Sequence, residues 1–190
     1  MARQAILILG APGSGKGTQA KNLEDHYGFI QVSTWELLRE RVKQSDELGK
    51  QLSEIMNTGQ FVSDELISQM LEEHITDLQV DKILFDGFPR NEAQIQIFEE
   101  LLKKLGIEDL IPIYLYVEEK ELIRRLLNRA IIEGRADDNE ETITKRIQTY
   151  HKVTKPVVEH YAKSPKFIQV SGDGQPAEVV WEELKKKLPF

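Results

Sequence analysis

The sequence predicts an α/β fold, a three-layer α/β/α domain built on a mostly parallel, five-stranded sheet. Two observations support this fold class. Apolar runs of strand length recur along the chain, and stretches with helical periodicity lie between them. The chain has 190 residues, of which 40% are hydrophobic, so it can bury one sizeable core. We therefore expect a single α/β unit with modest insertions.

The first strand and the loop after it form the most informative motif. Residues 5–9 are apolar, and the chain continues as Gly10-Ala11-Pro12-Gly13-Ser14-Gly15-Lys16-Gly17-Thr18. The glycines let the loop turn its backbone N–H groups around a polyphosphate, while Lys16 and a helix beginning near Gly17 add positive charge. We interpret the motif as a P-loop, although the usual hydroxyl after the lysine is displaced by one position, to Thr18. The alternative is an ordinary glycine turn between a strand and a helix.

The remaining strands follow from shorter apolar runs. They are predicted at residues 29–32, 82–85, 111–117 and 167–170, with the segment at 29–32 on the sheet edge. In sheets of this kind, ligands bind at the carboxyl ends of the strands. The turns after Leu9 and Phe85 both lie at that edge, so we expect the site there.

One helical insertion and one closing helix are predicted. Residues 33–62 have helical periodicity, with Ser33 or Thr34 as the N-cap, an end near Gly59 and no strand. Residues 176–188 have the pattern of a closing amphipathic helix.

A second insertion is predicted as a brief link, at residues 130–137, between two charged helices. Asp138 and Glu141 would form the N-terminal capping pair of the second helix. That helix would continue to about Tyr161, with a break near Pro156.

Composition argues against several classes of function. The net charge of −7 is unfavourable for nonspecific nucleic-acid binding, which needs broad basic surfaces. The absence of cysteine excludes disulfides and thiolate zinc sites, and the four histidines lack metal-ligand spacing. Neither a secretory leader nor an apolar run of membrane-spanning length is evident. We expect a cytoplasmic protein without zinc, nucleic-acid partners or membrane partners.

Asp86 follows a buried strand and begins the sequence Asp86-Gly87-Phe88-Pro89-Arg90. A carboxylate at this position, beside a phosphate-binding loop, can hold Mg²⁺ directly or through its waters. The alternative is a turn aspartate that caps the next helix.

The arginines indicate the kind of reaction. Five of the nine lie close together in sequence: Arg124, Arg125, Arg129, Arg135 and Arg146. A hydroxyl acceptor needs a base, but a phosphate acceptor already has nucleophilic oxygens, and its difficulty is repulsion between two polyanions. Guanidinium groups relieve that repulsion. The alternative is a solvated basic face with ordinary surface ion pairs.

These segments together resemble the adenylate kinase branch of the nucleoside monophosphate kinases, in its short-lid form. The matching stretches are residues 10–19, 33–34, 37–39, 59–62, 86–90, 94, 134–142, 146 and 150. The resemblance implies a P-loop core of residues 1–32, 63–127 and 138–190. Residues 33–62 would then be the insertion that binds the nucleoside monophosphate, and residues 128–137 the short lid. We expect a monomer.

The resemblance also implies roles for individual residues. The ATP site would consist of Gly13, Ser14, Gly15, Lys16, Gly17, Thr18, Arg125, Arg129 and Gly174. The AMP site would consist of Thr34, Arg39, Gln60, Phe61, Val62, Gly87, Phe88, Pro89, Arg90, Gln94, Arg135 and Arg146. The catalytic residues would be Lys16, Arg129, Arg135 and Arg146.

The implied reaction is the reversible, Mg²⁺-dependent transfer of the γ-phosphoryl group of ATP to AMP, giving two ADP. Gln94 matches the glutamine that reads the AMP base, whereas the pyrimidine monophosphate kinases carry asparagine there. The alternatives are a UMP or CMP acceptor and, less favoured, a nucleotide-dependent switch module.

The chain departs from the family at Trp35-Glu36, where the family has Gly-Asp. The indole of Trp35 would either narrow or line the acceptor pocket, or pack outward.

Overall fold

The structure is a computed structural model that describes residues 3–44, 46–58, 62–133 and 139–190. Five strands form one parallel sheet in the order β2-β3-β1-β4-β5. The strands are β1 (Arg3–Gly10), β2 (Ile30–Ser33), β3 (Lys82–Asp86), β4 (Ile107–Tyr116) and β5 (Ile168–Ser171). The predicted parallel sheet is confirmed, and β2 is an edge strand as expected.

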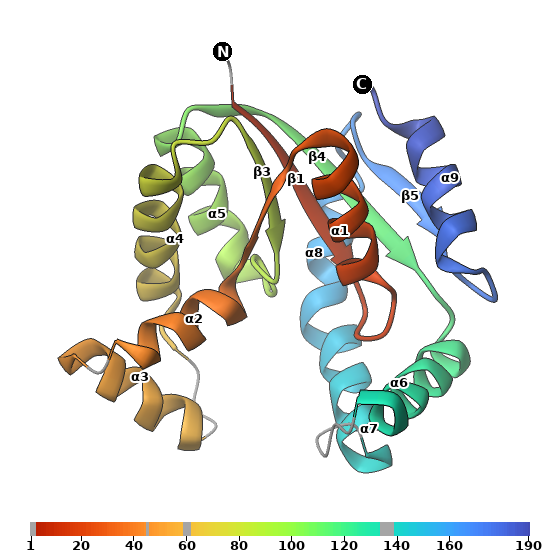
Figure 1. The fold of residues 1–190 in the computed structure, drawn as a ribbon, viewed down its shortest axis with the longest axis horizontal. Helices are drawn as coiled ribbons and strands as arrows, with labels where there is room; N and C mark the ends of the chain where they lie inside the picture. The colour runs from red at the N-terminus through yellow and green to blue at the C-terminus, as the bar shows by residue number, and fades with distance from the viewer. Residues whose placement is uncertain (1–2, 45, 59–61, 134–138) are drawn as a thin grey trace.

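Helices cover both faces of the sheet (Figure 1). On one face lie α1 (Lys16–Tyr27) and α9 (Ala177–Lys187). The other face is covered by α4 (Asp64–Leu78), α5 (Glu92–Lys104) and α8 (Lys155–Tyr161). The closing helix at the C-terminus is therefore confirmed as α9.

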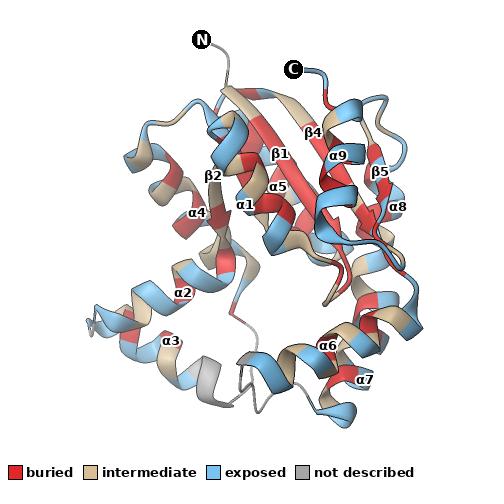
Figure 2. Cartoon of the chain, turned by 45° about the vertical axis from the view of Figure 1, so that its right-hand side comes forward, coloured by how far each residue is buried: buried red, intermediate tan, exposed pale blue. Residues whose placement is uncertain are grey.

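The central strand β1 shows why the apolar runs are continuous rather than alternating. Leu7 and Leu9 belong to the apolar cluster beneath α4, α5 and α8, whereas Ile6 and Ile8 belong to the cluster beneath α1 and α9. Successive side chains of a strand point to opposite faces, so each of residues 5–9 of β1 packs in the cluster on one face of the sheet or the other. Figure 2 shows the resulting band of buried residues along the strands.

The first insertion consists of α2 (Thr34–Lys43) and α3 (Glu47–Thr58), as the helical periodicity predicted. Buried side chains of these helices form a small apolar cluster with Val62 and with Met70 of α4. Ser33 is the N-cap of α2, but its side chain makes no capping hydrogen bond. The end predicted near Gly59 lies outside the described residues.

The second insertion corrects two predictions. The helix α6 (Glu119–Glu133) continues through residues 130–133, which the sequence analysis had placed in the link. No glycine or proline interrupts those four positions, so nothing ends the helix there. The following helix, α7 (Glu140–Thr149), is capped by Asn139, whose Oδ1 accepts from the Thr142 N–H at 3.0 Å, rather than by Asp138, which lies outside the described residues.

The predicted break near Pro156 is present as a π-helical turn, η1 (Tyr150–Thr154), between α7 and α8. The Lys155 N–H donates to the carbonyl of Tyr150, five residues earlier. Pro156 then lies in the first turn of α8, the part of a helix in which proline is best tolerated.

Two pairs of helices extend beyond the carboxyl ends of the strands, α2 and α3 on one side and α6 and α7 on the other (Figure 1). Among the described helices, none is both long enough and apolar enough to cross a membrane.

Candidate active site

The P-loop connects β1 to α1. Gly13 has a φ of +83°, and a Cβ atom built there would lie 3.0 Å from Leu126 Cγ of α6. A side chain at this position would therefore meet both an unfavourable backbone conformation and a neighbouring helix. Gly17 and Thr18 are exposed in the first turn of α1, and Ser14 is buried. The N–H groups of that turn have no acceptor within the helix, which suits the site to an anion.

Lys16 connects the P-loop electrostatically to three other parts of the chain. Its ammonium donates to the carbonyl oxygens of Gly10 at 2.8 Å and Ala11 at 3.1 Å. Burial lowers the pKa of Lys16 to about 8; the charge of Asp86 acts to raise this pKa, whereas Arg90 and Arg129 lower it further. Charges influence one another in this way only over short distances. Residues of β3, the loop before α5 and α6 therefore converge on the P-loop lysine.

Asp86 lies at the carboxyl end of β3, in register with Ile8 of β1 and Ser33 of β2. One of its carboxylate oxygens accepts from Gln31 Nε2 at 3.1 Å. Gln31 is a residue that the sequence analysis did not select, because only the pairing of β2 with β3 brings it to Asp86. The placement of Asp86 agrees with the predicted position, next to the P-loop strand.

Gly87 brings the predicted acceptor-side residues together. Its carbonyl oxygen accepts from Thr34 Oγ1 at 3.3 Å and from Arg90 Nε at 2.6 Å. Gly87 has a φ of +91°, and a Cβ atom there would lie 2.7 Å from Arg90 Nη2 and 2.9 Å from Thr34 Oγ1. Only glycine allows Thr34 and Arg90 to approach this closely.

Gln94 is buried in the first turn of α5. Its Oε1 accepts from the backbone N–H of Arg90 at 2.6 Å, and its Nε2 donates to Asp64 Oδ1 at 2.6 Å. Phe88 and Val62 are buried in apolar clusters, so their side chains serve the core and only their backbones are available for a ligand.

Trp35 and Arg39 form a pair on the outer surface of α2. The Arg39 guanidinium carbon lies 5.1 Å from the centroid of the Trp35 ring, in a cation–π contact. The indole is 46% exposed. Of the two expectations for Trp35, its exposure agrees with outward packing, and its contact joins it to the predicted phosphate-binding arginine.

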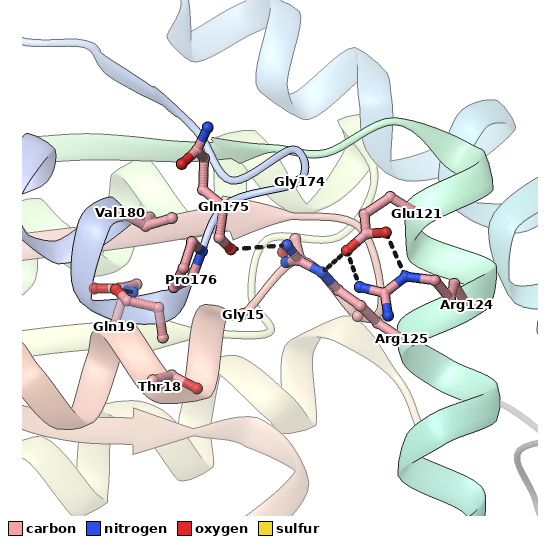
Figure 3. Close-up of a pocket in the computed structure, with 13 residues that line it drawn as sticks. Gly15, Thr18, Gln19, Glu121, Arg124, Arg125, Gly174, Gln175, Pro176 and Val180 are labelled. Carbon is pink, nitrogen blue, oxygen red and sulfur yellow. Dashed lines mark hydrogen bonds and ion pairs between the residues drawn. The ribbon is translucent and has the colours of Figure 1, made fainter.

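A pocket of about 500 Å³ lies between the P-loop, α6 and the loop before α9 (Figure 3). Gly13, Ser14, Gly15 and Thr18 line it, together with Arg125 and Gly174. These are six of the nine residues predicted for ATP, and residues from two ends of the chain contribute to the same pocket.

Arg125 is fixed at the wall of this pocket. Its guanidinium donates to Glu121 at 2.7 Å and to the carbonyl of Gln175 at 3.3 Å (Figure 3). It also donates to the carbonyl of Gly172 at 2.5 Å. Hydrogen bonds from Arg124 and Arg125 hold the pKa of Glu121 well below its usual range. Glu121 and Gln175 were not predicted as site residues, because their contribution depends on contacts between distant parts of the chain.

Pro89 is buried in the loop before α5. The other predicted residues divide into two groups. Arg129 of α6 and Arg146 of α7 are half-buried, and each has an interaction partner. Gln60, Phe61 and Arg135 lie outside the described residues.

Comparisons with known proteins agree with this geometry. A family model described as "Adenylate kinase" matches residues 8–166. Adenylate kinase of Thermus thermophilus is 41% identical over 176 residues, covering 93% of this chain and 92% of the relative. Adenylate kinase of Porphyromonas gingivalis is 44% identical over 175 residues, covering 92% and 90%. The chain therefore belongs to the adenylate kinase family of nucleoside monophosphate phosphotransferases.

Proposed function

We propose that the chain catalyses reversible transfer of the γ-phosphoryl group of Mg-ATP to AMP, giving two ADP. The observation that supports this proposal most directly is the set of charges around Lys16. The pKa of this lysine responds to Asp86, to Arg90 on the acceptor side and to Arg129 on α6. A protein that only bound or slowly hydrolysed one nucleotide would have no use for Arg90 and Gln94 beside its phosphate site.

In the proposed reaction, the P-loop binds the ATP phosphates and the pocket beside Arg125 receives the adenine. Arg39 and Arg90 bind the AMP phosphate. An oxygen of that phosphate forms a bond to the γ-phosphorus while the bond from this phosphorus to the β–γ bridging oxygen breaks, so that both products are ADP. The attacking phosphate needs no general base.

Catalysis then depends on positioning and charge neutralisation. Two polyanions must meet, and the positive charges of Lys16, Arg129, Arg135 and Arg146 offset their repulsion. Closure of the two insertions over the nucleotides would exclude water and prevent transfer to it.

Adenylate kinases generally use Mg²⁺ with ATP, and Asp86 has the chemistry to assist. Across the described residues, no group of three or more His, Cys, Asp or Glu side chains could hold a metal ion. Mg²⁺ bound with a nucleotide needs only one or two carboxylates, because phosphates and waters complete its shell. Asp86 would hold the ion through water, and the ion would neutralise phosphate charge. The cytoplasmic location, the monomeric state and the absence of nucleic-acid or membrane partners are further parts of the proposal.

The test is a coupled assay of ADP formation from ATP with AMP, UMP or CMP, at one Mg²⁺ concentration. We expect AMP to give the highest kcat/KM. A preference for UMP or CMP would change the acceptor but keep the reaction. ATP binding without acceptor-dependent ADP formation would contradict phosphoryl transfer and favour a switch module.

A further inference from the structure

We propose that Asp64 is a positioning residue that fixes the orientation of the Gln94 side-chain amide and thereby selects acceptor bases carrying an exocyclic amino group. The inference rests on the proposed function, in which Gln94 faces the base of the acceptor nucleotide. It adds a specificity-determining residue on a second helix.

Asp64 and Gln94 belong to the first turns of two helices that lie side by side, α4 and α5 (Figure 1). Gln94 is only 7% exposed, and its backbone N–H donates to Asn91 Oδ1 at 2.9 Å, so its main chain is held. Its side-chain amide is held on both sides, by Asp64 Oδ1 and by the Arg90 N–H, each at 2.6 Å.

The two partners permit only one orientation of the amide. A carboxylate of Asp64 can only accept hydrogen bonds, so the amide NH₂ must face it. The backbone N–H of Arg90 can only donate, so the amide oxygen must face that side. Turning the Gln94 amide over would place oxygen against oxygen and N–H against N–H, and both hydrogen bonds would be lost. The orientation thus follows from the chemistry of the partners rather than from the assignment of N and O atoms.

The fixed amide retains one N–H donor and one oxygen lone pair beyond these two bonds. Adenine offers an exocyclic amino donor next to a ring-nitrogen acceptor, which complements that pair. Hypoxanthine has nearly the same shape, but it offers a carbonyl acceptor next to a ring N–H donor. It would need the opposite amide orientation, which Asp64 and the Arg90 N–H oppose. Asp64 should therefore disfavour IMP relative to AMP.

The experiment compares kcat/KM for AMP and for IMP, with ATP as donor, in the wild type and in three variants. Asp64→Ala removes the acceptor for the Gln94 amide. Glu65→Ala is the matched control, because Glu65 is an exposed acid in the same helical turn. Asp64→Asn retains one oxygen that can accept. The AMP-to-IMP ratio is insensitive to a general loss of active protein, which affects both acceptors equally.

We expect the wild type to prefer AMP, and Asp64→Ala to reduce the AMP-to-IMP ratio by roughly tenfold or more, the usual worth of a base-edge hydrogen-bond pair. The ratio should be unchanged in Glu65→Ala and largely recovered in Asp64→Asn. The KM for ATP should stay constant in all of them.

If the AMP-to-IMP ratio of kcat/KM were unchanged in Asp64→Ala, or fell equally in Glu65→Ala, the role of Asp64 would be overturned. The proposed function would still be supported, provided that these proteins form ADP from AMP. A wild type that uses AMP and IMP equally well would overturn it without any variant. Absence of AMP-dependent ADP formation in the wild type would instead overturn the proposed function itself.

Discussion

The donor half of the site and the part of the acceptor half that carries Arg39 rest on different supports. The donor half is built on the sheet, because the P-loop joins the central strand β1 to α1, and Arg125 is held by Glu121 and two loop carbonyls. Arg39, on the acceptor half, is exposed on α2 and contacts Trp35. The helices α2 and α3 have a small apolar cluster of their own.

This difference suggests how each half can change. Donor residues are tied to clusters that also hold the sheet together, so substitutions there put packing at risk. The insertion that carries Arg39 can shift with less exposure of apolar surface than a helix that covers the sheet. We expect affinity for the acceptor phosphate, to which Arg39 is proposed to contribute, to vary more readily than the geometry of the phosphate loop.

The largest effect is expected at Arg146, whose charge is proposed to offset the repulsion between the two nucleotides. Arg146→Ala should lower kcat by on the order of 10³-fold, as loss of an arginine finger does, with little change in ATP affinity. Lys145→Ala is the matched control, because this exposed neighbour pairs with Glu141 on the surface of α7. Steady-state kinetics beside an ATP titration measures both quantities. Turnover of Arg146→Ala within a few-fold of the wild type would contradict the role.

The next effect concerns pH and tests the donor half. The pKa of Lys16 is about 8 in the free protein, below its ordinary value, so the ammonium loses its proton as pH rises through that value. The phosphates bind the charged form, so ATP affinity should fall by up to about tenfold for each further pH unit. Calorimetric titrations in buffers of different ionisation enthalpy should also detect proton uptake on binding.

Two substitutions isolate the contribution of that lysine. Lys16→Met should bind ATP weakly and lose the alkaline pH dependence, whereas Lys21→Met, an exposed change on the same helix, should keep it. If ATP affinity fell equally steeply with rising pH in the wild type and in Lys16→Met, the titrating group would be a residue other than Lys16.

The smallest effect tests the acceptor half at Trp35. Loss of the cation–π contact in Trp35→Ala should raise the KM for AMP by about two- to fivefold, from the 0.5–1 kcal/mol of an exposed contact. Trp35→Phe retains an aromatic ring face, so its KM for AMP should lie between those of the wild type and Trp35→Ala. The KM for ATP should not move. A lower KM for AMP in Trp35→Ala would indicate instead that the indole crowds the acceptor pocket.

Local sequence signals were sufficient for the sheet and the phosphate loop. The apolar runs correspond to β1 to β5, and the resemblance to adenylate kinases is confirmed by the family match. These features depend on spacing within short segments, which periodicity and turn residues record directly.

The remaining features depend on contacts between segments. Gln31 meets Asp86 only because β2 pairs with β3, and Asp64 meets Gln94 only because α4 lies beside α5. The predicted end of α6 was wrong. A helix can continue wherever no residue stops it, and the sequence has no stop signal before Gly134. The roles of all the predicted site residues stay predictions, and Gln60, Phe61 and Arg135 lie outside the described residues.

The π-helical turn between α7 and α8 has a mechanical consequence. Val157 and Val158 anchor α8 in the core beneath the sheet, while Ile143 and Ile147 tie α7 to α6. A π-helical turn is a site at which an otherwise continuous helix bends more easily. We expect any rotation of α7, which carries Arg146, relative to α8 to take place about residues 150–154. Substitutions that stiffen this hinge would then slow the rotation of α7, although none of these residues is predicted to bind a nucleotide.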